Sequence, residues 1–455
     1  MSPLRNRPTR RLQNGLGALS AAIVLALCLG AGGCGSLAAD PSLGAGDLGL
    51  LESAMRQVNQ SYVVPVKSEQ LVSGALKGML SKLDPHSDYM TEREYRELLS
   101  TTSGQFGGVG IEISVEEGVP QVISAIEGTP AASAGIEPGD RIVKADGQPI
   151  VGMDIGEVVR RLRGAPGTRV VLTIARANRV AFDVPITRAI IHVDSVKLAL
   201  KPGRLGYVRV STFDENTPAA LRSALARLRQ ESGGRLAGFV LDLRNDAGGL
   251  LDSAVEVAAD FLDSGTVVIT RGREADENRV YDAPPNGDLI RGTPMVVLIN
   301  GASASASEIV AGALQDNRRA TVLGTRSFGK GSVQSIIPLD GKGALRLTTA
   351  LYFTPSGRSI QGHGIAPDRV VEVPKEQQVA NAVITYESDL FGALKATGAL
   401  APTSAPQGAP PAAAPTRPVA TGADHPINPK VIGTAQDAQL GAALDLLGAR
   451  RAAAR

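Results

Sequence analysis

The sequence predicts a multidomain α/β protein, of the α+β kind, and three observations support this. Its 455 residues, 43% of them apolar, are enough to build several hydrophobic cores. Short β-rich runs broken by Gly and Pro fill residues 106–188. Strand-like and helix-like segments then alternate to residue 375, which is typical of an α/β core. The expected order is a signal sequence (1–39), an N-terminal helical segment (40–105), a β-rich domain (106–188), the core (189–375), a C-terminal extension of the core (376–398), a disordered Ala/Pro linker (399–425) and a short helical segment (426–455).

The first 39 residues have the layout of a secretory signal, with an uncharged stretch at residues 16–33. This stretch is short and contains several glycines, whereas a membrane span needs about 20 strongly apolar residues. We therefore expect an exported protein of the periplasm or cell envelope. The arginines that precede the stretch are Arg5, Arg7, Arg10 and Arg11.

Both cysteines, Cys28 and Cys34, fall in this leader, so the expected mature chain has no disulfide. A lipid anchor at Cys34 and cleavage by ordinary signal peptidase near residue 38 remain alternatives. The chain carries 47 Lys and Arg against 45 Asp and Glu. Because this balance gives no strongly basic field, nucleic acid is not an expected partner.

Apolar residues recur at three- and four-residue spacing between residues 47 and 100, which predicts amphipathic helices. These helices form a small subdomain, a dimer arm or a lid, and the sequence does not separate the three. A second apolar stripe, residues 438–447, predicts a short helix near the C-terminus.

Three motifs occur in order within the β-rich domain. They are G-G-V-G-I-E-I from Gly107, G-T-P-A-A-S-A-G-I-E-P-G-D-R-I from Gly128 and G-Q-P-I from Gly147, followed by a helix-like run at 155–162. Together they closely resemble a bacterial PDZ domain over about residues 106–188. The resemblance implies that a peptide adds as a strand and that backbone N–H groups of a glycine-bearing loop hold its terminal carboxylate. That loop is Gly108, Val109, Gly110 and Ile111.

The core offers two places for an active site. Strands are expected at 238–243 and 295–299, and helices at 250–262 and 305–314. Active sites of such sheets lie beyond the carboxyl ends of the strands, here residues 245–249 and 300–307.

Three serines, Ser303, Ser305 and Ser307, compete at the second of these turns. A serine between a strand and a helix is exposed near helix N–H groups, which can stabilise an oxyanion. The alternative interpretation is that Ser303 or Ser307 only caps the helix.

A serine nucleophile needs a base, and no histidine stands in a motif that suggests catalysis. A Ser-His-Asp triad formed by residues far apart in the sequence stays an alternative that no sequence feature supports. Lysine can replace histidine when burial lowers its pKa, because desolvation penalises the ammonium form. The run F-G-K-G-S-V-Q places Lys330 between two glycines and beside apolar residues. Taken alone, such a lysine is more often a surface residue.

The runs S-A-S-A-S-E-I, G-A-L-Q-D and F-G-K-G-S-V-Q resemble the C-terminal processing peptidases, or tail-specific proteases, and the resemblance covers about residues 47–375. It implies that Ser305 is the nucleophile, Lys330 the base and Gln334 the residue that orients the lysine. It also implies an oxyanion hole formed by the N–H of Ala306 and one from the Gly248-Gly249 pair, for which we favour Gly248. It implies no metal or cofactor.

One departure from the family pattern concerns the oxyanion loop. The family usually reads L-D-L-R-N-N-P-G-G, whereas this chain has Asp246 and Ala247 in place of Asn-Pro. We expect the negative charge of Asp246 to raise the pKa of the catalytic lysine. The change removes no hydrogen-bond donor.

These features predict an exported serine endopeptidase that cleaves proteins near their C-termini and uses its PDZ domain to recognise C-terminal tails. A non-catalytic peptide-binding module or a PDZ scaffold with a vestigial core are the alternatives. We further expect a homodimer paired through apolar stripes at 48–83 and 438–447, and gated by a PDZ ligand or an activator protein. Hinges for the gating are expected at 101–105 and 187–193. The alternative is a monomer whose PDZ domain only tethers substrate.

Overall fold

The computed structural model describes residues 45–116, 118–126, 128–176, 179–192, 194–285, 287–379, 384–395 and 426–453. The expected signal sequence, both cysteines and the expected linker at 399–425 lie outside these residues. The chain divides into two units at Val66 and Lys67. Within the described residues, no helix has both the length and the apolar character of a membrane span.

The first unit contains helix α1 (Ala45–Ser61), which agrees with the predicted N-terminal helix. Leu48, Leu51 and Val58, three members of its apolar stripe, are exposed. Within the described residues of this unit, 45–66, nothing covers this stripe.

The second unit begins with two further predicted helices, α2 (Ser68–Leu80) and α3 (Glu92–Thr102). Thr91 and Glu94 form a capping box at the start of α3, since each accepts the other's backbone N–H, at 3.3 and 2.7 Å. Between the helices lies strand β1 (Asp88–Met90), which the periodicity did not predict.

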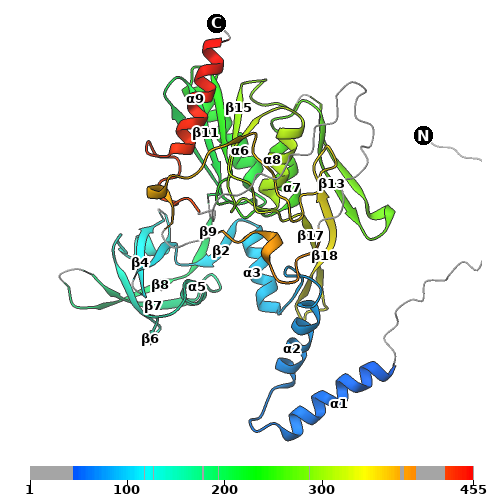
Figure 1. Ribbon diagram of the computed structural model, residues 1–455. Coiled ribbons are helices and arrows are strands. Elements are labelled where there is room, and N and C mark those ends of the chain that lie inside the picture. Colours follow the sequence, from blue (N-terminus) through cyan, green and yellow to red (C-terminus); the bar gives the residue numbers. More distant parts are fainter. Residues whose placement is uncertain are drawn as a thin grey trace, which may run out of the picture. The chain divides into compact units, whose positions relative to one another are not determined.

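The β-rich domain is an antiparallel sheet in the order β3-β4-β5-β7-β8, with β6 paired to β5. Figure 1 shows β4, β6, β7 and β8 together with helix α5 in this domain. Asp154 caps helix α5 by accepting the N–H of Glu157 at 3.0 Å. The apolar side chains of α5 and the sheet form a separate core around Ile142, Val158 and Leu172. Its elements are β3 (Ile111–Glu116), β4 (Val119–Ala125), α4 (Pro130–Ser133), β5 (Arg141–Ala145), β6 (Gln148–Pro149), α5 (Ile155–Leu162), β7 (Arg169–Ala175) and β8 (Phe182–Thr187).

The two segments expected to be hinges are close together in this unit. Strands β2 (Gln105–Gly108) and β9 (Ala189–His192) pair antiparallel, with Gln105 opposite His192. Both the entry to and the exit from the β-rich domain therefore run through one two-stranded ribbon.

A six-stranded sheet in the order β10-β11-β12-β15-β16-β19 forms the core. All its pairs are parallel except β10 with β11, which confirms the predicted α/β core. Strand β12, expected at 238–243, is Gly238–Asp242, and β15 is Met295–Ile299. Both strands are buried throughout, as expected for a sheet covered on both faces. The remaining strands are β10 (Val196–Lys201), β11 (Leu205–Val210), β16 (Thr321–Gly324) and β19 (Arg369–Val370).

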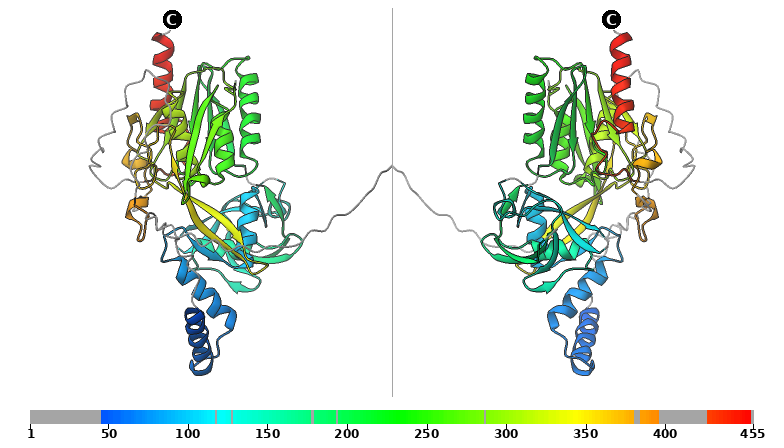
Figure 2. Two further views of the ribbon diagram at one scale, coloured as in Figure 1. Left: turned by 90° about the vertical axis from the view of Figure 1, so that its right-hand side faces the viewer. Right: turned by 90° about the vertical axis from the view of Figure 1, so that its left-hand side faces the viewer.

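Helices cover the two faces of this sheet. Alternate residues such as Phe239 and Leu241 pack against α6 (Thr217–Glu231), α7 (Leu251–Ala259) and α8 (Ala306–Asp316). Val240, between them in the sequence, packs on the other face against α9 (Ala438–Ala453). The side views show α6 and α9 on opposite sides of the sheet (Figure 2).

A second, antiparallel sheet carries the lysine motif. Its order is β1-β18-β13-β14, and β17 pairs with the long strand β18. The sequence predicted neither this sheet nor its link to the N-terminal segment through β1. Its elements beyond β1 are β13 (Gly265–Gly272), η1 (Ala275–Glu277), β14 (Arg279–Ala283), β17 (Ser332–Pro338) and β18 (Ala344–Phe353), and two short turns follow the core, η2 (Lys375–Gln377) and η3 (Glu387–Asp389).

The C-terminal helix corrects one expectation. Leu440, Ala443 and Leu447, part of the stripe expected to pair between subunits, are buried against the chain's own sheet. Just before the helix, Asp437 forms an ion pair with the fully buried Arg244, with 2.6 Å between Nη2 and Oδ2. Residues 426–453 are thus an integral part of the core.

Candidate active site

The turn between β15 and α8 places Ser305 at the start of the helix. Its φ of 56° and ψ of −112° are rare for a residue with a side chain, and such strain is often found at functional turns. The serine is 7% exposed and packs against Gly248. A Cβ atom added to Gly248 would lie 3.0 Å from Ser305 Cβ, so this close approach requires glycine.

Hydrogen bonding separates the three candidate serines. Ser303 Oγ donates to the carbonyl of Leu243 at 2.8 Å and accepts the amide of Asn300 at 3.0 Å. Ser307 Oγ donates to the carbonyl of Asp246 at 3.0 Å. The Ser305 hydroxyl forms no comparable bond within the described residues. Two serines therefore tie the strand ends together, and only Ser305 keeps a hydroxyl for chemistry.

The expected oxyanion donors lie side by side. Ala306 opens helix α8, so its N–H has no acceptor within the helix. A Cβ on Gly248 would lie 2.8 Å from that nitrogen. The amide of Gly248 itself, however, donates to Asp246 Oδ1 at 2.8 Å. In this arrangement, the favoured glycine donor is already hydrogen-bonded.

The predicted base and its orienting residue are in direct contact. Lys330 lies just before β17, and its Nζ donates to Gln334 Oε1 at 2.5 Å. The amide nitrogen of Gln334 donates in turn to Ser332 Oγ at 3.0 Å and Thr348 Oγ1 at 3.1 Å. The glutamine is therefore held in the orientation in which its oxygen faces the lysine.

Glu308 connects the serine turn with the lysine loop. Its Oε2 accepts the amides of Ser305 at 2.8 Å and Lys330 at 2.9 Å. Its Oε1 accepts the amide of Gly329 at 2.7 Å and the hydroxyl of Ser327 at 2.5 Å. Burial raises the pKa of Glu308 to about 7, although these four donors favour the carboxylate. The described residues include no hydrogen bond between Ser305 Oγ and Lys330 Nζ. The Glu308 carboxyl group and a backbone bond from the Phe328 amide to the Ser303 carbonyl, at 2.9 Å, join the two loops.

Burial lowers the pKa of Lys330 below its usual value, which favours the neutral amine that a base requires. Among nearby carboxylates, those of Glu387, Glu308 and Asp84 act most strongly in the opposite direction. Asp246, expected to have this effect, is not among them. Its carboxyl group instead faces the amide of Gly248.

The run D-P-H-S, at residues 84–87, joins the lysine site, and the sequence analysis missed it. Asp84 forms a turn by accepting the amides of His86 at 2.8 Å and Ser87 at 2.9 Å, and Asp-Pro is a recognisable turn signal. Asp84 also accepts the hydroxyl of Thr348 at 3.1 Å, behind Gln334. Only long-range pairing of β1 with β18 reveals this connection.

His86 belongs to the same network. Its Nε2 lies 2.8 Å from an oxygen of the buried Glu387, which also accepts Gln361 Nε2 at 2.9 Å. Gln361 in turn accepts the amide of Gly331, next to the lysine, at 2.9 Å. The histidine therefore acts on the carboxylate behind the lysine and is not bonded to Ser305.

The loop expected to hold a peptide carboxylate lines a groove. A cavity of about 110 Å³ is bordered by Gly108, Val109, Gly110 and Ile111, and by residues from α5 on its other side. Gly110 has a φ of 81°, and an added Cβ would lie 2.3 Å from Thr129. Glycine is thus required where the loop turns.

Arg163 adds a positive charge to this groove. Its guanidinium lies 4.3 Å above the ring of Phe106, and its buried Nε has no hydrogen-bond partner within the described residues. The sequence analysis did not single it out.

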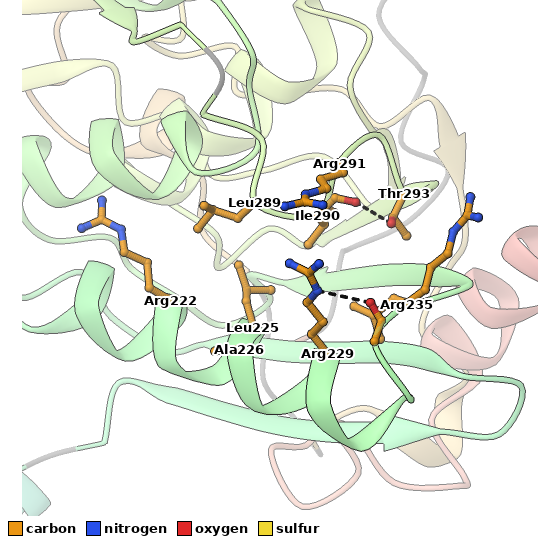
Figure 3. A pocket seen from close by; sticks show the side chains of 11 residues that line it. Arg222, Leu225, Ala226, Arg229, Arg235, Leu289, Ile290, Arg291 and Thr293 are labelled. Carbon is orange, nitrogen blue, oxygen red and sulfur yellow. Dashed lines mark hydrogen bonds between the residues drawn. The ribbon is translucent and has the colours of Figure 1, made fainter.

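A larger cavity, of about 540 Å³, lies between α6 and the loop before β15 (Figure 3). Apolar side chains such as Leu225 and Ile290 line it together with four arginines. It contains none of the expected site residues, so we do not assign the chemistry to it. The described residues also contain no group of His, Cys, Asp and Glu that could hold a metal ion.

Comparison with known families gives three matches along the chain. Residues 204–371 match the model of peptidase family S41, and residues 121–176 match that of the PDZ domain. Residues 38–94 match the N-terminal domain of the activating protease CtpB.

Two curated relatives cover most of the chain. A carboxy-terminal-processing protease of Bartonella bacilliformis is 48% identical over 342 residues, 74% of this chain and 78% of that protein. The carboxy-terminal processing protease CtpA of Bacillus subtilis is 33% identical over 375 residues, 81% and 79% of the two chains. Among solved structures, the photosystem II D1 C-terminal processing protease is 30% identical, with a TM-score of 0.43 over 71% of this chain and 92% of that one.

Proposed function

The chain belongs to the carboxy-terminal-processing serine proteases of peptidase family S41, and we propose that it acts as a Ser-Lys endopeptidase. Ser305 is the nucleophile, neutral Lys330 takes its proton, an acyl-enzyme forms at Ser305 Oγ, and water then releases it. Gln334 keeps the lysine amine directed toward the site. The observation that carries the proposal is the shared carboxyl group of Glu308, which binds the backbone of both residues.

The Ala306 N–H supplies one donor for the developing oxyanion, since it lies at the positive end of α8. A second donor comes from the Gly248-Gly249 pair, which packs against the same turn. Gly248 can serve only if its amide leaves Asp246 or is shared with it.

The PDZ groove supports recognition of C-terminal tails. The loop around Gly110 offers backbone N–H groups, and Arg163 offers a positive charge to a carboxylate. We infer that it binds the tails of substrates or of an activator protein, which directs cleavage to nearby residues.

Gating and assembly remain part of the proposal. The ribbon of β2 and β9 is the double connection through which a bound tail can favour one domain arrangement. Because α9 is buried, we assign the homodimer contact to the exposed apolar residues of the 48–83 stripe, such as Leu48, Leu51 and Met79.

We propose export from the leader alone, with the periplasm or cell envelope as the destination. A lipid anchor at Cys34 is one form of this proposal, and release after ordinary signal cleavage is the other.

An unstructured protein substrate tests the function. We expect mass spectrometry to find early fragments that derive from cleavage near its C-terminus. A C-terminally amidated twin should be cut more slowly because it lacks the carboxylate. Equal rates on both substrates would contradict tail recognition, while complete absence of cleavage would contradict the peptidase.

A further inference from the structure

Asp246 has an unusual environment for an ionisable side chain. It is fully buried in the loop that follows β12. Its Oδ1 accepts the amide of Gly248 at 2.8 Å, whereas its buried Oδ2 has no hydrogen-bond partner within the described residues. A carboxylate normally needs several donors when it is buried, so this site suits a neutral carboxyl group better.

The same residue also ties the loop to the nucleophile turn. Its carbonyl accepts the amide of Ala304 at 3.0 Å and the hydroxyl of Ser307 at 3.0 Å. Gly248, held by the side chain, packs on the amide of Ala306. The Asp246 carboxyl group is therefore hydrogen-bonded directly to the glycine that borders the oxyanion site.

Few charges compensate an ionised Asp246. The Gly248 amide, the Ser307 hydroxyl and, more weakly, Arg209 of β11 favour the carboxylate, but burial outweighs them and raises the pKa of Asp246 to about 8. Glu308 is engaged by the lysine loop, and Arg244 is paired with Asp242 and Asp437. Asp214 after β11, and Asp252 and Glu256 of α7, are themselves acidic.

We propose that Asp246 is a positioning residue of the oxyanion hole and that its neutral form is the active one. The neutral carboxyl group still accepts the Gly248 amide and fixes the loop. The carboxylate would place a negative charge beside the forming oxyanion and hold that amide more tightly, which opposes catalysis. The inference rests on Ser305 as the proposed nucleophile.

The expected signature is a falling limb in the pH profile. Ionisation of Asp246 should lower wild-type kcat/KM by about tenfold per pH unit above about pH 8. Asp246→Asn can accept the same amide but cannot ionise, and asparagine is the residue that the family pattern has here. The ratio of Asp246→Asn to wild-type kcat/KM should thus rise about tenfold per unit above that pH.

The experiment compares the full-length wild type, Asp246→Asn, Asp246→Ala and the exposed control Asp263→Asn on one peptide substrate between pH 6 and 10. Asp246→Ala should lower kcat at every pH and lack the falling limb, because Gly248 loses its acceptor. Asp263→Asn should follow the wild type. A falling limb that persists in Asp246→Asn would overturn the inference.

A second measurement needs no activity. Between pH 5 and 8, Asp246 should keep its proton in the folded wild type and lose it in the unfolded chain. As pH rises through this range, the stability of the wild type should therefore fall relative to that of Asp246→Asn, and the difference should level off above pH 8. A constant difference in unfolding temperature over this range would refute the raised pKa and with it the inference. Cleavage by Ser305→Ala would instead count against the proposed function, so the two failures are distinguishable.

Discussion

Oε2 of Glu308 lies 2.8 Å from the amide nitrogen of Ser305, and the same oxygen accepts the amide of Lys330. Glu308→Gln keeps the size of the side chain but replaces one acceptor oxygen by an amide that faces other donors. We expect kcat to fall at least about tenfold and stability to fall by about 1–3 kcal/mol. Steady-state kinetics and denaturant unfolding measure both, with the exposed Glu256→Gln as the matched control. Wild-type kcat in Glu308→Gln would show that the bridge does not position the site.

The pH at which activity rises should depend on Glu387. Burial lowers the pKa of Lys330, and Glu387 is the carboxylate that opposes this most. Glu387→Gln should therefore move the rising limb of kcat/KM to lower pH, because the lysine loses its proton more readily. A shift to higher pH, or none, would contradict the assignment of this limb to the lysine.

The lowered pKa of Lys330 also affects the stability of the fold. Between the lowered pKa of Lys330 and its ordinary value of 10.5, the unfolded chain binds one more proton than the folded chain. The lysine's contribution should therefore make the fold more stable as pH rises through this window. Lys330→Met should remove that part of the pH dependence in thermal unfolding.

The C-terminal segment should be needed for the core. Asp437→Ala leaves the fully buried Arg244 with one carboxylate partner in place of two, so we expect a loss of about 3–5 kcal/mol. Asp445→Ala, on the exposed face of α9, is the control and should change stability by less than about 0.5 kcal/mol. Chemical denaturation compares them, and equal midpoints would mean that the ion pair contributes little.

Gly110 provides the test of the PDZ groove. In Gly110→Ala the new Cβ would lie 2.3 Å from Thr129 at a positive φ, so the loop must move. Affinity for an apolar-ended peptide should drop at least about tenfold, while cleavage of a short reporter that cannot reach the groove should persist. Gly128→Ala also has a positive φ but open space around it, and it serves as the control for strain alone. Equal loss in both variants would argue against a specific role of the loop.

The sequence was most informative where motifs are local. The alternation of strands and helices predicted β12, β15, α7 and α8 to within a few residues, because buried parallel strands and amphipathic helices have clear periodicities. The same local signal placed Ser305 in the turn between β15 and α8. The local signal could not rank the three serines. What distinguishes them is that Ser303 and Ser307 form hydrogen bonds with Leu243 and Asp246, about 60 residues away in the sequence.

What the sequence missed depends on long-range contacts. The link of Asp84 and His86 to the lysine network arises from strand pairing and contacts across more than 250 residues. The apolar stripe of α9 was expected to be free for pairing between subunits, but it is buried against the core sheet. Periodicity reveals an apolar face and does not reveal what covers it. Asp246 was expected to act on the lysine, yet its side chain turns to Gly248.

The central claim, that Ser305 and Lys330 form one catalytic unit, is tested most directly by cleavage of an unstructured protein. We predict that Ser305→Ala and Lys330→Ala each abolish cleavage, with unfolding temperatures within a few degrees of the wild type, and that the double variant is no worse than either. Substantial cleavage by Ser305→Ala, or a double variant far less active than both single variants, would contradict the claim.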